Sequence, residues 1–266
     1  MHSNIRWLKH ALIHWFVNRY KVDMSQAENE DLSSYKNFNQ FFTRPIKKQL
    51  RPVCAEQNCI ACPVDGSISQ LGIIEDNKIF QAKGHSFSLD ALLAYQTPWV
   101  DYFRDGQFAT IYLSPKDYHR IHMPIDATLK QMSYIPGTLF SVSPMTTQMI
   151  PDLFSRNERV ACFFETAFGP MALVLVGAMI VGSIETTWQG RICPPHGKET
   201  KHWQYNLPHK VAGSGPYLLR KGDEMGRFNM GSTVILLFNK NTVRWNAELS
   251  TESLVQMGMN IATIAG

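Results

Sequence analysis

The hydrophobic positions near the start of the chain recur at helical spacing. Between residues 5 and 22 the large apolar side chains are Leu8, Leu12, Trp15 and Phe16. Basic side chains stand among them: Arg6, Lys9, His10, Arg19 and Lys21. This pattern predicts an amphipathic basic helix. A second, short helix is predicted over residues 34–42, and it ends at Thr43-Arg44-Pro45 because proline breaks a helix.

Two interpretations of the basic helix stay open at this point. Such a helix can lie in a membrane interface, with its aromatic rings at headgroup depth and its cations near anionic lipid. It can also pack its apolar side on the rest of the protein, as terminal helices of globular proteins often do. Under either interpretation, we expect residues 1–50 to form an N-terminal helical segment.

After Pro52 the pattern changes to short runs of β-branched and aromatic residues between Gly, Pro, Asn and Asp. Examples are SISQLGII, KIFQA, FATIYL and ERVACFFE. These runs predict strands that do not alternate regularly with long helices, which favours an antiparallel or mixed sheet. Residues 88–95 predict an internal helix, and residues 147–154 a further helical turn. The predicted fold class is α+β, with N-terminal helices followed by a strand-rich, mainly antiparallel body over residues 51–266.

Composition supports one folded domain. The 266 residues are 44% hydrophobic and 18% charged, which predicts a substantial core rather than disorder. The longest apolar run, residues 171–184, is shorter than the roughly 18 residues of a membrane-spanning helix and predicts one or two buried strands. A formal charge of +4 is too small to indicate nucleic acid as a partner and is compatible with an anionic surface.

The five cysteines predict no disulfide framework, because their number is odd and no apolar leader precedes them. A reducing compartment fits this pattern better. Cys54, Cys59 and Cys62 have the spacing of three iron–sulfur ligands, but chance spacing of thiols is the favoured interpretation. A second group of possible metal ligands could bind zinc, but an ordinary surface loop is the favoured interpretation. This group contains Cys193, His196, His202 and His209. We therefore expect no metal.

Three short motifs carry residues with catalytic chemistry. His119 and His122 lie in YLSPKDYHRIHMP, and Asp65 lies in the sharp turn PVDG. Ser232 stands between Gly231 and a threonine at the start of an apolar strand, and the G-x-S-x-G motif of hydrolases is missing. In a Ser-His-Asp set the carboxylate orients the imidazole, which removes the hydroxyl proton. The activated Ser232 can attack an external ester, as in a serine hydrolase, or the carbonyl of Gly231.

Taken together, several motifs resemble those of one enzyme family in order and spacing. They are PVDG, KGHSFSLDALL, YLSPKDYHRIHMP, FGPMALVLVGAMIVGSIET and KGDEMGRFNMGSTVILLF. The chain resembles the bacterial phosphatidylserine decarboxylases of the self-processing, pyruvoyl-dependent kind, from about Val22 to its C-terminal strands. It departs from the common pattern at Met230, where leucine is usual, and at Val64, where alanine is common. Neither position carries a reacting atom.

The resemblance implies that the proenzyme cuts itself between Gly231 and Ser232, with Asp65, His122 and Ser232 as the charge-relay set. The products are a β chain of residues 1–231 and an α chain of residues 232–266, which stay together as a heterodimer. Ser232 becomes a pyruvoyl group. This cofactor forms a Schiff base with phosphatidylserine, which loses CO2 to give phosphatidylethanolamine in phospholipid biosynthesis. His119, with an ordinary imidazole pKa near 6.5, is the candidate proton donor.

A lipid substrate also implies a membrane location. We expect a peripheral protein on the cytoplasmic side of the cell membrane, bound to phosphatidylserine in an anionic bilayer; a higher oligomer stays open. Residues 134–154 are either a second lipid-facing surface or ordinary core. Two alternatives remain: a serine hydrolase using Ser232, His122 and Asp65, and a membrane-surface binding module with inert histidines.

Overall fold

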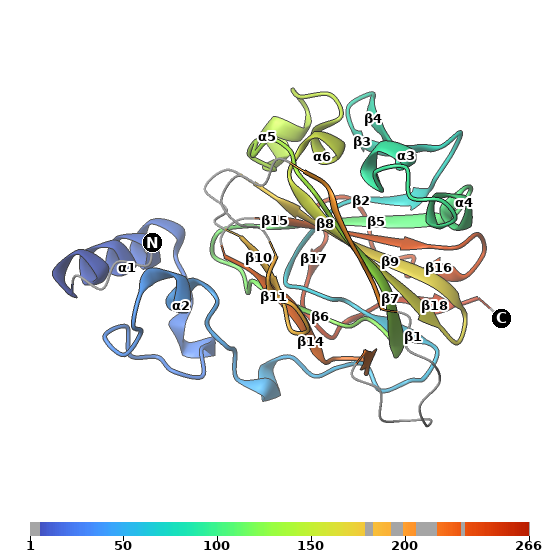
Figure 1. Ribbon diagram of the computed structural model, residues 1–266. Helices are drawn as coiled ribbons and strands as arrows, with labels where there is room; N and C mark the ends of the chain where they lie inside the picture. The colour runs from blue at the N-terminus through green and yellow to red at the C-terminus, as the bar shows by residue number, and fades with distance from the viewer. Residues whose placement is uncertain (1–5, 179–182, 193–198, 206–216, 230–231, 266) are drawn as a thin grey trace.

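The computed structural model describes residues 6–178, 183–192, 199–205, 217–229 and 232–265. An N-terminal segment, residues 6–50, lies beside a larger strand-rich body (Figure 1). The N-terminal segment contains α1 (Arg6–Tyr20), the short 3-10 helix η1 (Met24–Gln26), α2 (Phe38–Phe42) and the short 3-10 helix η2 (Lys48–Leu50). The first predicted helix is confirmed. The second is shorter than predicted, because the side chain of Asn37 caps the helix by accepting a hydrogen bond from the backbone N–H of Gln40.

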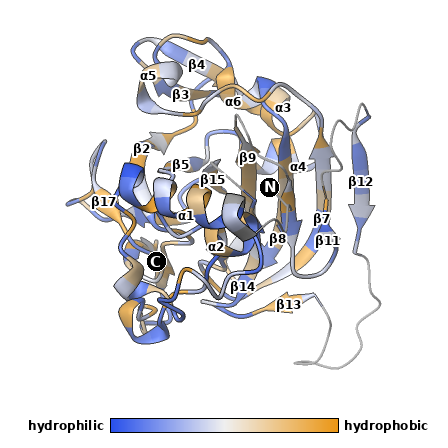
Figure 2. Ribbon diagram, turned by 90° about the vertical axis from the view of Figure 1, so that its left-hand side faces the viewer, coloured by the Kyte–Doolittle hydropathy of each residue, from blue (hydrophilic) through white to orange (hydrophobic). Residues whose placement is uncertain are grey.

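The two helices of the N-terminal segment pack against each other through aromatic rings. Ile13 and Phe16 of α1 are buried, and the Phe16 ring centroid lies 5.1 Å from that of Phe38 and 5.9 Å from that of Phe42. Trp7 and Trp15 point away from this cluster and are 73% and 56% exposed. Figure 2 looks onto α1 and α2 in front of the main sheet. One face of α1 therefore packs on protein, and the other faces solvent.

The body is built on a nine-stranded sheet, and every pairing between its strands is antiparallel, as predicted. The strand order is β12-β7-β8-β9-β15-β5-β2-β17, and β13 also pairs with β7. The strands are β2 (Gly66–Ile73), β5 (Gln107–Leu113), β7 (Ala127–Ile135), β8 (Arg159–Thr166), β9 (Gly169–Gly177), β12 (Lys201–Gln204), β13 (Leu218–Leu219), β15 (Ser232–Phe238) and β17 (Leu254–Val255).

Smaller sheets and short helices complete the body. A four-stranded sheet is formed by β11 (Gly190–Arg191), β10 (Ile184–Thr186), β14 (Glu224–Phe228) and β6 (Arg120–His122). A three-stranded sheet contains β1 (Cys59–Ala61), β18 (Asn260–Ile264) and β16 (Val243–Trp245), and β3 (Lys78–Ala82) pairs with β4 (His85–Ser88). The short helices are α3 (Leu89–Leu92), α4 (Trp99–Phe103), α5 (Pro144–Thr147) and α6 (Leu153–Arg156).

The internal helices are shorter than the sequence predicts. The helix expected over residues 88–95 is reduced to α3, and the turn expected over residues 147–154 is split between the end of α5 and the start of α6. The apolar run 171–184 forms most of β9 and the first residue of β10, which confirms the predicted buried strands. No described helix is both long and apolar enough to cross a bilayer.

Strand β15 lies inside the sheet and has hydrophobic neighbours on both faces. Val234, Leu236 and Phe238 belong to one buried cluster, while Ile235 and Leu237 belong to a second. The alternation follows from the two-residue period of a strand, which sends successive side chains to opposite faces. All seven residues of β15 are buried, and Ser232 is the first of them.

The cysteines correct one expectation from the sequence. Cys54 and Cys59 form a disulfide, with Cα atoms 6.7 Å apart, whereas Cys62 and Cys162 are free and buried. An odd number of cysteines does not exclude a single local disulfide. Two cysteines five residues apart can come close enough to bond when the chain between them forms a loop. The bond also removes two thiolates from the alternative iron–sulfur interpretation. Of the zinc alternative, only His202 lies in the described residues, and its Nδ1 is 2.9 Å from the Ser133 hydroxyl.

Gly66 provides a test of how tightly the sheet holds the PVDG turn. A Cβ atom there would lie 2.3 Å from the carbonyl oxygen of Tyr112 on β5, whereas a Cβ at Gly72 of the same strand would meet only the Phe108 ring at 3.6 Å. We expect Gly66→Ala to lower the free energy of unfolding by about 2–3 kcal/mol, as overpacking does. Gly72→Ala should lower it by less than about 1 kcal/mol.

Urea unfolding of both variants, each in a Ser232→Ala background, measures this difference. Equal unfolding midpoints for the two variants would show that β2 can shift to accommodate the added methyl group.

Candidate active site

The structure brings the predicted residues to one end of the main sheet. Asp65 precedes β2, and Ser232 opens β15; their strands are joined by β5, where Tyr112 pairs with Ser67 and Leu113 pairs with Ser232. His122 ends β6, and its backbone N–H donates to the Pro63 carbonyl at 2.8 Å, which ties β6 to the PVDG turn. Gly231 lies outside the described residues.

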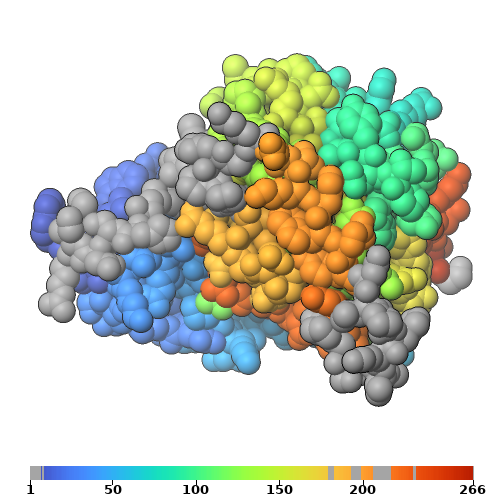
Figure 3. Space-filling model, in the orientation of Figure 1, coloured from blue at the N-terminus to red at the C-terminus, as the bar shows by residue number. Residues whose placement is uncertain are grey.

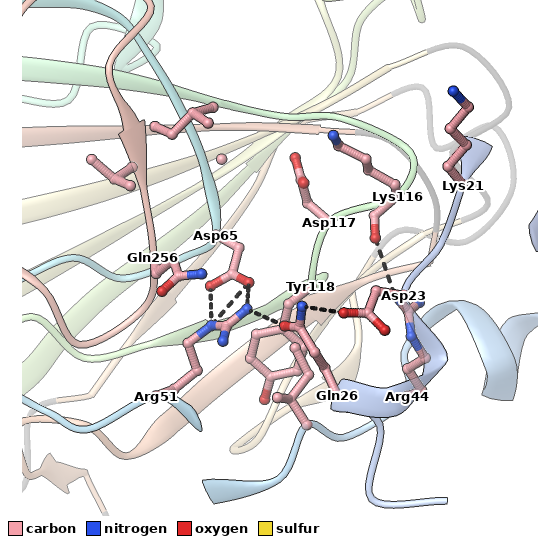
Figure 4. Close-up of a pocket in the computed structure, with 14 residues that line it drawn as sticks. Lys21, Asp23, Gln26, Arg44, Arg51, Asp65, Lys116, Asp117, Tyr118 and Gln256 are labelled. Atoms are coloured by element: carbon pink, nitrogen blue, oxygen red, sulfur yellow. Dashed lines mark hydrogen bonds and ion pairs between the residues drawn. The ribbon is translucent and has the colours of Figure 1, made fainter. Parts of the chain in front are cut away.

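Asp65 is held by a buried ion pair. The Arg51 Nε lies 2.9 Å and 3.0 Å from the two Asp65 carboxylate oxygens, and Nη2 makes a further contact with Oδ2 (Figure 4). The backbone N–H of Met257 donates to Oδ1 at 2.9 Å. The Arg51 and Asp65 side chains are only 7% and 9% exposed. A bidentate pair of this kind fixes both the position and the orientation of the carboxylate.

His122 is fixed through both ring nitrogens. Its Nδ1 lies 2.8 Å from the carbonyl oxygen of Gly222, which only accepts, so Nδ1 carries the hydrogen. Its Nε2 lies 2.9 Å from the Tyr118 hydroxyl and therefore accepts from it. Burial raises the pKa of Tyr118, which keeps this donor protonated, and burial is also the main cause of the lowered pKa of His122. His122 is a neutral imidazole in this arrangement.

Asp65 and His122 are both among the described residues, and they do not form the direct hydrogen bond of a charge relay. Asp65 accepts from Arg51 and Met257, and His122 bonds to Gly222 and Tyr118. Asp65 nevertheless raises the pKa of His122 by a small Coulombic effect. The two side chains are thus neighbours whose hydrogen bonds are directed elsewhere.

His119 differs from the sequence-based expectation of an ordinary imidazole. It is 0% exposed, its ring centroid lies 4.1 Å from that of Phe42, and its Nδ1 donates to the Asp117 carbonyl at 2.8 Å. Burial lowers its pKa to about 3. Its Nε2 has no hydrogen-bond partner among the described residues. His119 therefore offers a lone pair at neutral pH, and the prediction of a ready proton donor with a pKa near 6.5 is wrong for this state.

Ser232 also has an unpartnered polar atom. Its side chain is 0% exposed, and Oγ has no hydrogen-bond partner within the described residues. The residue is paired with Leu113 on β5 and with Gly177 on β9. A buried hydroxyl without a partner costs about 1–3 kcal/mol, so its position is fixed by the strand rather than by its own hydrogen bonds.

A cleft of about 250 Å³ opens beside Asp65, between the N-terminal segment and the body. Figure 4 shows Lys21 and Lys116 at one side of it, with Asp65 and Arg51 at the other. Arg44 also lines the cleft and is 4% exposed; its Nη2 donates to the Lys116 carbonyl at 3.0 Å. The lining carries both signs of charge, and it is the N-terminal segment that closes one wall.

Sequence reasoning missed Arg51 and Tyr118. Tyr118 lies inside the histidine motif, next to His119, so its position was a usable signal. Arg51 stands 14 residues before Asp65, and no spacing rule connects an arginine before a turn with a carboxylate inside the turn. The pair is seen only in the fold, where Arg51, just after η2, meets Asp65, just before β2.

Burial of His119 makes stability depend on pH. The unfolded chain binds a proton at this histidine below about pH 6.5, and the folded chain does not until about pH 3, so stability falls as the pH falls between these values. At 1.4 kcal/mol for each pH unit, acidification from pH 6.5 to 5 should cost about 2 kcal/mol through His119 alone.

The measurement is urea unfolding against pH in a Ser232→Ala background. His119→Gln should lose about 2 kcal/mol less than its parent over this range, and the exposed His14→Gln should behave like the parent. An unchanged pH dependence in His119→Gln would refute the assignment.

Comparisons with known proteins agree with the motifs. The family model for phosphatidylserine decarboxylase matches residues 38–263. A relative from Ectopseudomonas mendocina is 54% identical over 96% of this chain and 87% of its own length. One from Pseudomonas fluorescens is 53% identical over 97% and 88%, and one from Photobacterium profundum is 52% identical over 93% and 84%. Each of the three is named phosphatidylserine decarboxylase proenzyme.

The match covers α2, the histidine motif and β15, and so includes all four predicted catalytic residues: Asp65, His119, His122 and Ser232. With a family model spanning most of the chain and relatives more than half identical, the chain belongs to the phosphatidylserine decarboxylase family.

Proposed function

We propose that this chain converts phosphatidylserine to phosphatidylethanolamine and CO2, after cutting itself between Gly231 and Ser232. The observation that carries the proposal is the placement of Ser232. In a chain whose relatives are named proenzymes, this serine opens a buried strand with a hydroxyl that no described residue engages. A hydroxyl with no competing donor or acceptor is available to the adjacent backbone carbonyl.

The cut begins when Ser232 Oγ adds to the Gly231 carbonyl. The C–N bond then breaks, the Ser232 nitrogen takes the hydroxyl proton, and an ester links the two residues. Removal of the Ser232 Cα proton breaks the Cβ–O bond, so residues 1–231 leave with a carboxylate terminus. The remaining dehydroalanine takes up water and releases ammonia, which leaves a ketone at the start of residues 232–266.

Asp65 and His122 remain our assignment for the proton transfers of the cut. His122 accepts a proton only through Nε2, because Nδ1 already carries a hydrogen bonded to Gly222. The Tyr118 hydroxyl must therefore release Nε2 before His122 acts as the base. Asp65, fixed by Arg51, stabilises the imidazolium that results.

The pyruvoyl group would be held by β15, since it replaces Ser232. The site fits it, because Ser232 Oγ is buried and no described residue donates to it or accepts from it. Once formed, the group would supply a ketone able to accept the substrate amine and to draw electrons from the bond to the carboxylate. His119 can take the surplus proton of the arriving ammonium through Nε2, which no described residue engages, and later return it to the product carbon.

A hydrolase acting on external esters is the less favoured alternative. The G-x-S-x-G motif of hydrolases is missing, and relatives more than half identical to this chain are named decarboxylase proenzymes. A buried serine suits attack on its own backbone, which needs no entry path.

Self-cleavage is tested by intact-mass spectrometry together with conversion of phosphatidylserine. The parent should give two chains, the smaller of about 4 kDa at roughly 110 Da per residue. Ser232→Ala should stay whole and inactive, and His122→Ala should accumulate precursor. His119→Ala should cut at least partly and decarboxylate about a hundredfold or more slowly. If Ser232→Ala also gave two chains, the assignment of the cut to Ser232 would be wrong. If both histidine variants cut normally, neither histidine would take part in self-cleavage.

The membrane location remains part of this proposal: a peripheral protein on the cytoplasmic face of the cell membrane. Support comes from α1, whose Trp7 and Trp15 are exposed, and from α5 with the residues just after it, where Met145 and Met149 are 69% and 70% exposed. Phe16 is 5% exposed and cannot insert as predicted, because it packs on α2. Figure 3 shows the N-terminal segment (blue) projecting from one side of the body.

The structure modifies two further expectations about this surface. Lys9 is less available to lipid than expected, because its Nζ donates to the carbonyl oxygens of Ser33 and Tyr35 at 3.3 Å and 2.7 Å. In residues 134–154, Tyr134, Leu153 and Phe154 are core, as one interpretation expected, while Met145 and Met149 are exposed, so a lipid-facing surface stays a proposal for the residues around α5.

Vesicle co-sedimentation tests docking by α1. Changing both Trp7 and Trp15 to Ser should sharply reduce binding to vesicles that contain phosphatidylserine, because these rings supply the apolar, salt-resistant part. Parent binding should weaken but persist in high salt, since charge attraction alone is screened within about 8 Å at physiological ionic strength.

Phe168→Ser is the matched control. Phe168 is a 44% exposed ring in the turn between β8 and β9, at the end of β9 away from the residue that pairs with Ser232. Both proteins should process normally and turn over a short-chain, monomeric substrate at the parent rate. Unchanged vesicle binding by the double tryptophan variant would move the docking surface to α5.

A further inference from the structure

The N-terminal segment reaches the chain just ahead of Ser232. Asn39 of α2 donates from Nδ2 to the Asn229 Oδ1 at 2.8 Å, across 190 residues of sequence. Asn229 lies three residues before Ser232. We infer that Asn39 is a positioning residue for self-cleavage, acting through Asn229. The inference rests on the proposed function, because it concerns the same cut.

Asn229 is fixed on three sides. Its backbone N–H donates to the Ser183 carbonyl at 3.0 Å, and its Nδ2 donates to the Ser183 hydroxyl at 2.7 Å. Asn39 supplies the remaining bond, to the side-chain oxygen. Asn229 is only 7% exposed, so water is poorly placed to replace that bond if Asn39 loses its amide. An unpaired buried amide oxygen is costly, and the residue would move to relieve it.

Ser232 is fixed as well, by pairing with both neighbouring strands. The predicted cut therefore falls between two anchored residues, Asn229 on one side and Ser232 on the other. Attack on a carbonyl requires the reacting atoms within about 3–3.5 Å and correctly oriented, and anchoring both flanks removes much of the entropy cost. Asn39 contributes to the upstream anchor alone.

The end of α2 and the two residues after it also contact the histidine motif. The Phe42 ring covers His119, Arg120 Nε donates to the Thr43 carbonyl at 2.9 Å, and Arg44 donates to the Lys116 carbonyl. Helix α2 is thus a wall of the catalytic region rather than a tether to it. This close packing keeps Asn39 in register with Asn229.

The test compares self-cleavage rates in pulse-labelled full-length chains. Asn39→Leu, similar in size but without the amide donor, should cut about tenfold more slowly than the parent. Gln40→Leu, the matched control on the same helix, should cut at the parent rate, since the Gln40 side chain bonds only to the Lys36 backbone among the described residues. Asn39→Leu cutting as fast as the parent would overturn the inference, whereas a parent that does not cut would instead defeat the proposed function.

A double-mutant cycle checks that the effect passes through Asn229. Asn229→Leu should be at least as slow as Asn39→Leu, because it loses the bond to Ser183 as well. Combining the two changes should give the rate of Asn229→Leu alone, since Asn39 then has no partner to act on. A further tenfold slowing in the double variant would show an independent effect of Asn39 and would contradict the inference.

Comparing self-cleavage with decarboxylation distinguishes positioning by Asn39 from a general effect on stability. Once fully processed, Asn39→Leu should show the parent kcat and KM for decarboxylation, because the upstream chain is no longer bonded to residue 232. Its uncut form, in a Ser232→Ala background, should unfold within a few degrees of the parent Tm. Equal losses in cutting rate and kcat, or a collapse in Tm, would assign Asn39 a general role in stability instead.

Discussion

The buried start of β15 is the constraint on which the rest of the site depends. Ser232 is paired into the sheet on both sides and has no exposed surface, so neither solvent nor a mobile loop sets its position. The carbonyl that precedes Ser232 in the chain is that of Gly231, so this burial supports the proposed self-cleavage, which needs no entry path for a substrate.

Burial at this end of the sheet also determines the protonation states. Desolvation lowers the pKa of both His119 and His122, so both are neutral and each has one nitrogen able to accept a proton. Arg51 and Asp65, the charged pair beside them, neutralise each other at short range. The precursor therefore contains proton acceptors and a fixed carboxylate, and its two histidines are not ready acids. In the proposed reactions, protons would therefore come from the serine hydroxyl or from the substrate ammonium.

The sequence predicted what local patterns encode and missed what only long-range folding creates. Alternating apolar residues predicted the antiparallel body, and the motifs singled out Asp65, His122 and Ser232, which the structure brings to one end of the sheet. The Arg51–Asp65 pair and the Asn39–Asn229 bond join residues 14 and 190 positions apart, and no periodicity relates such partners. The ordinary pKa assumed for His119 failed for the same reason, because the ring that buries it comes from α2.

Helix α2 links two requirements that the sequence presented as separate. On one side it holds α1 through the ring of Phe16, and the tryptophans of α1 are exposed. On the other side it covers His119 and bonds to Asn229. If α2 made no contact with the body, substitutions in it would not affect the residues around His119 and Asn229. Because α2 is packed on both sides, the segment proposed to meet the lipid is built from the same residues that close the site.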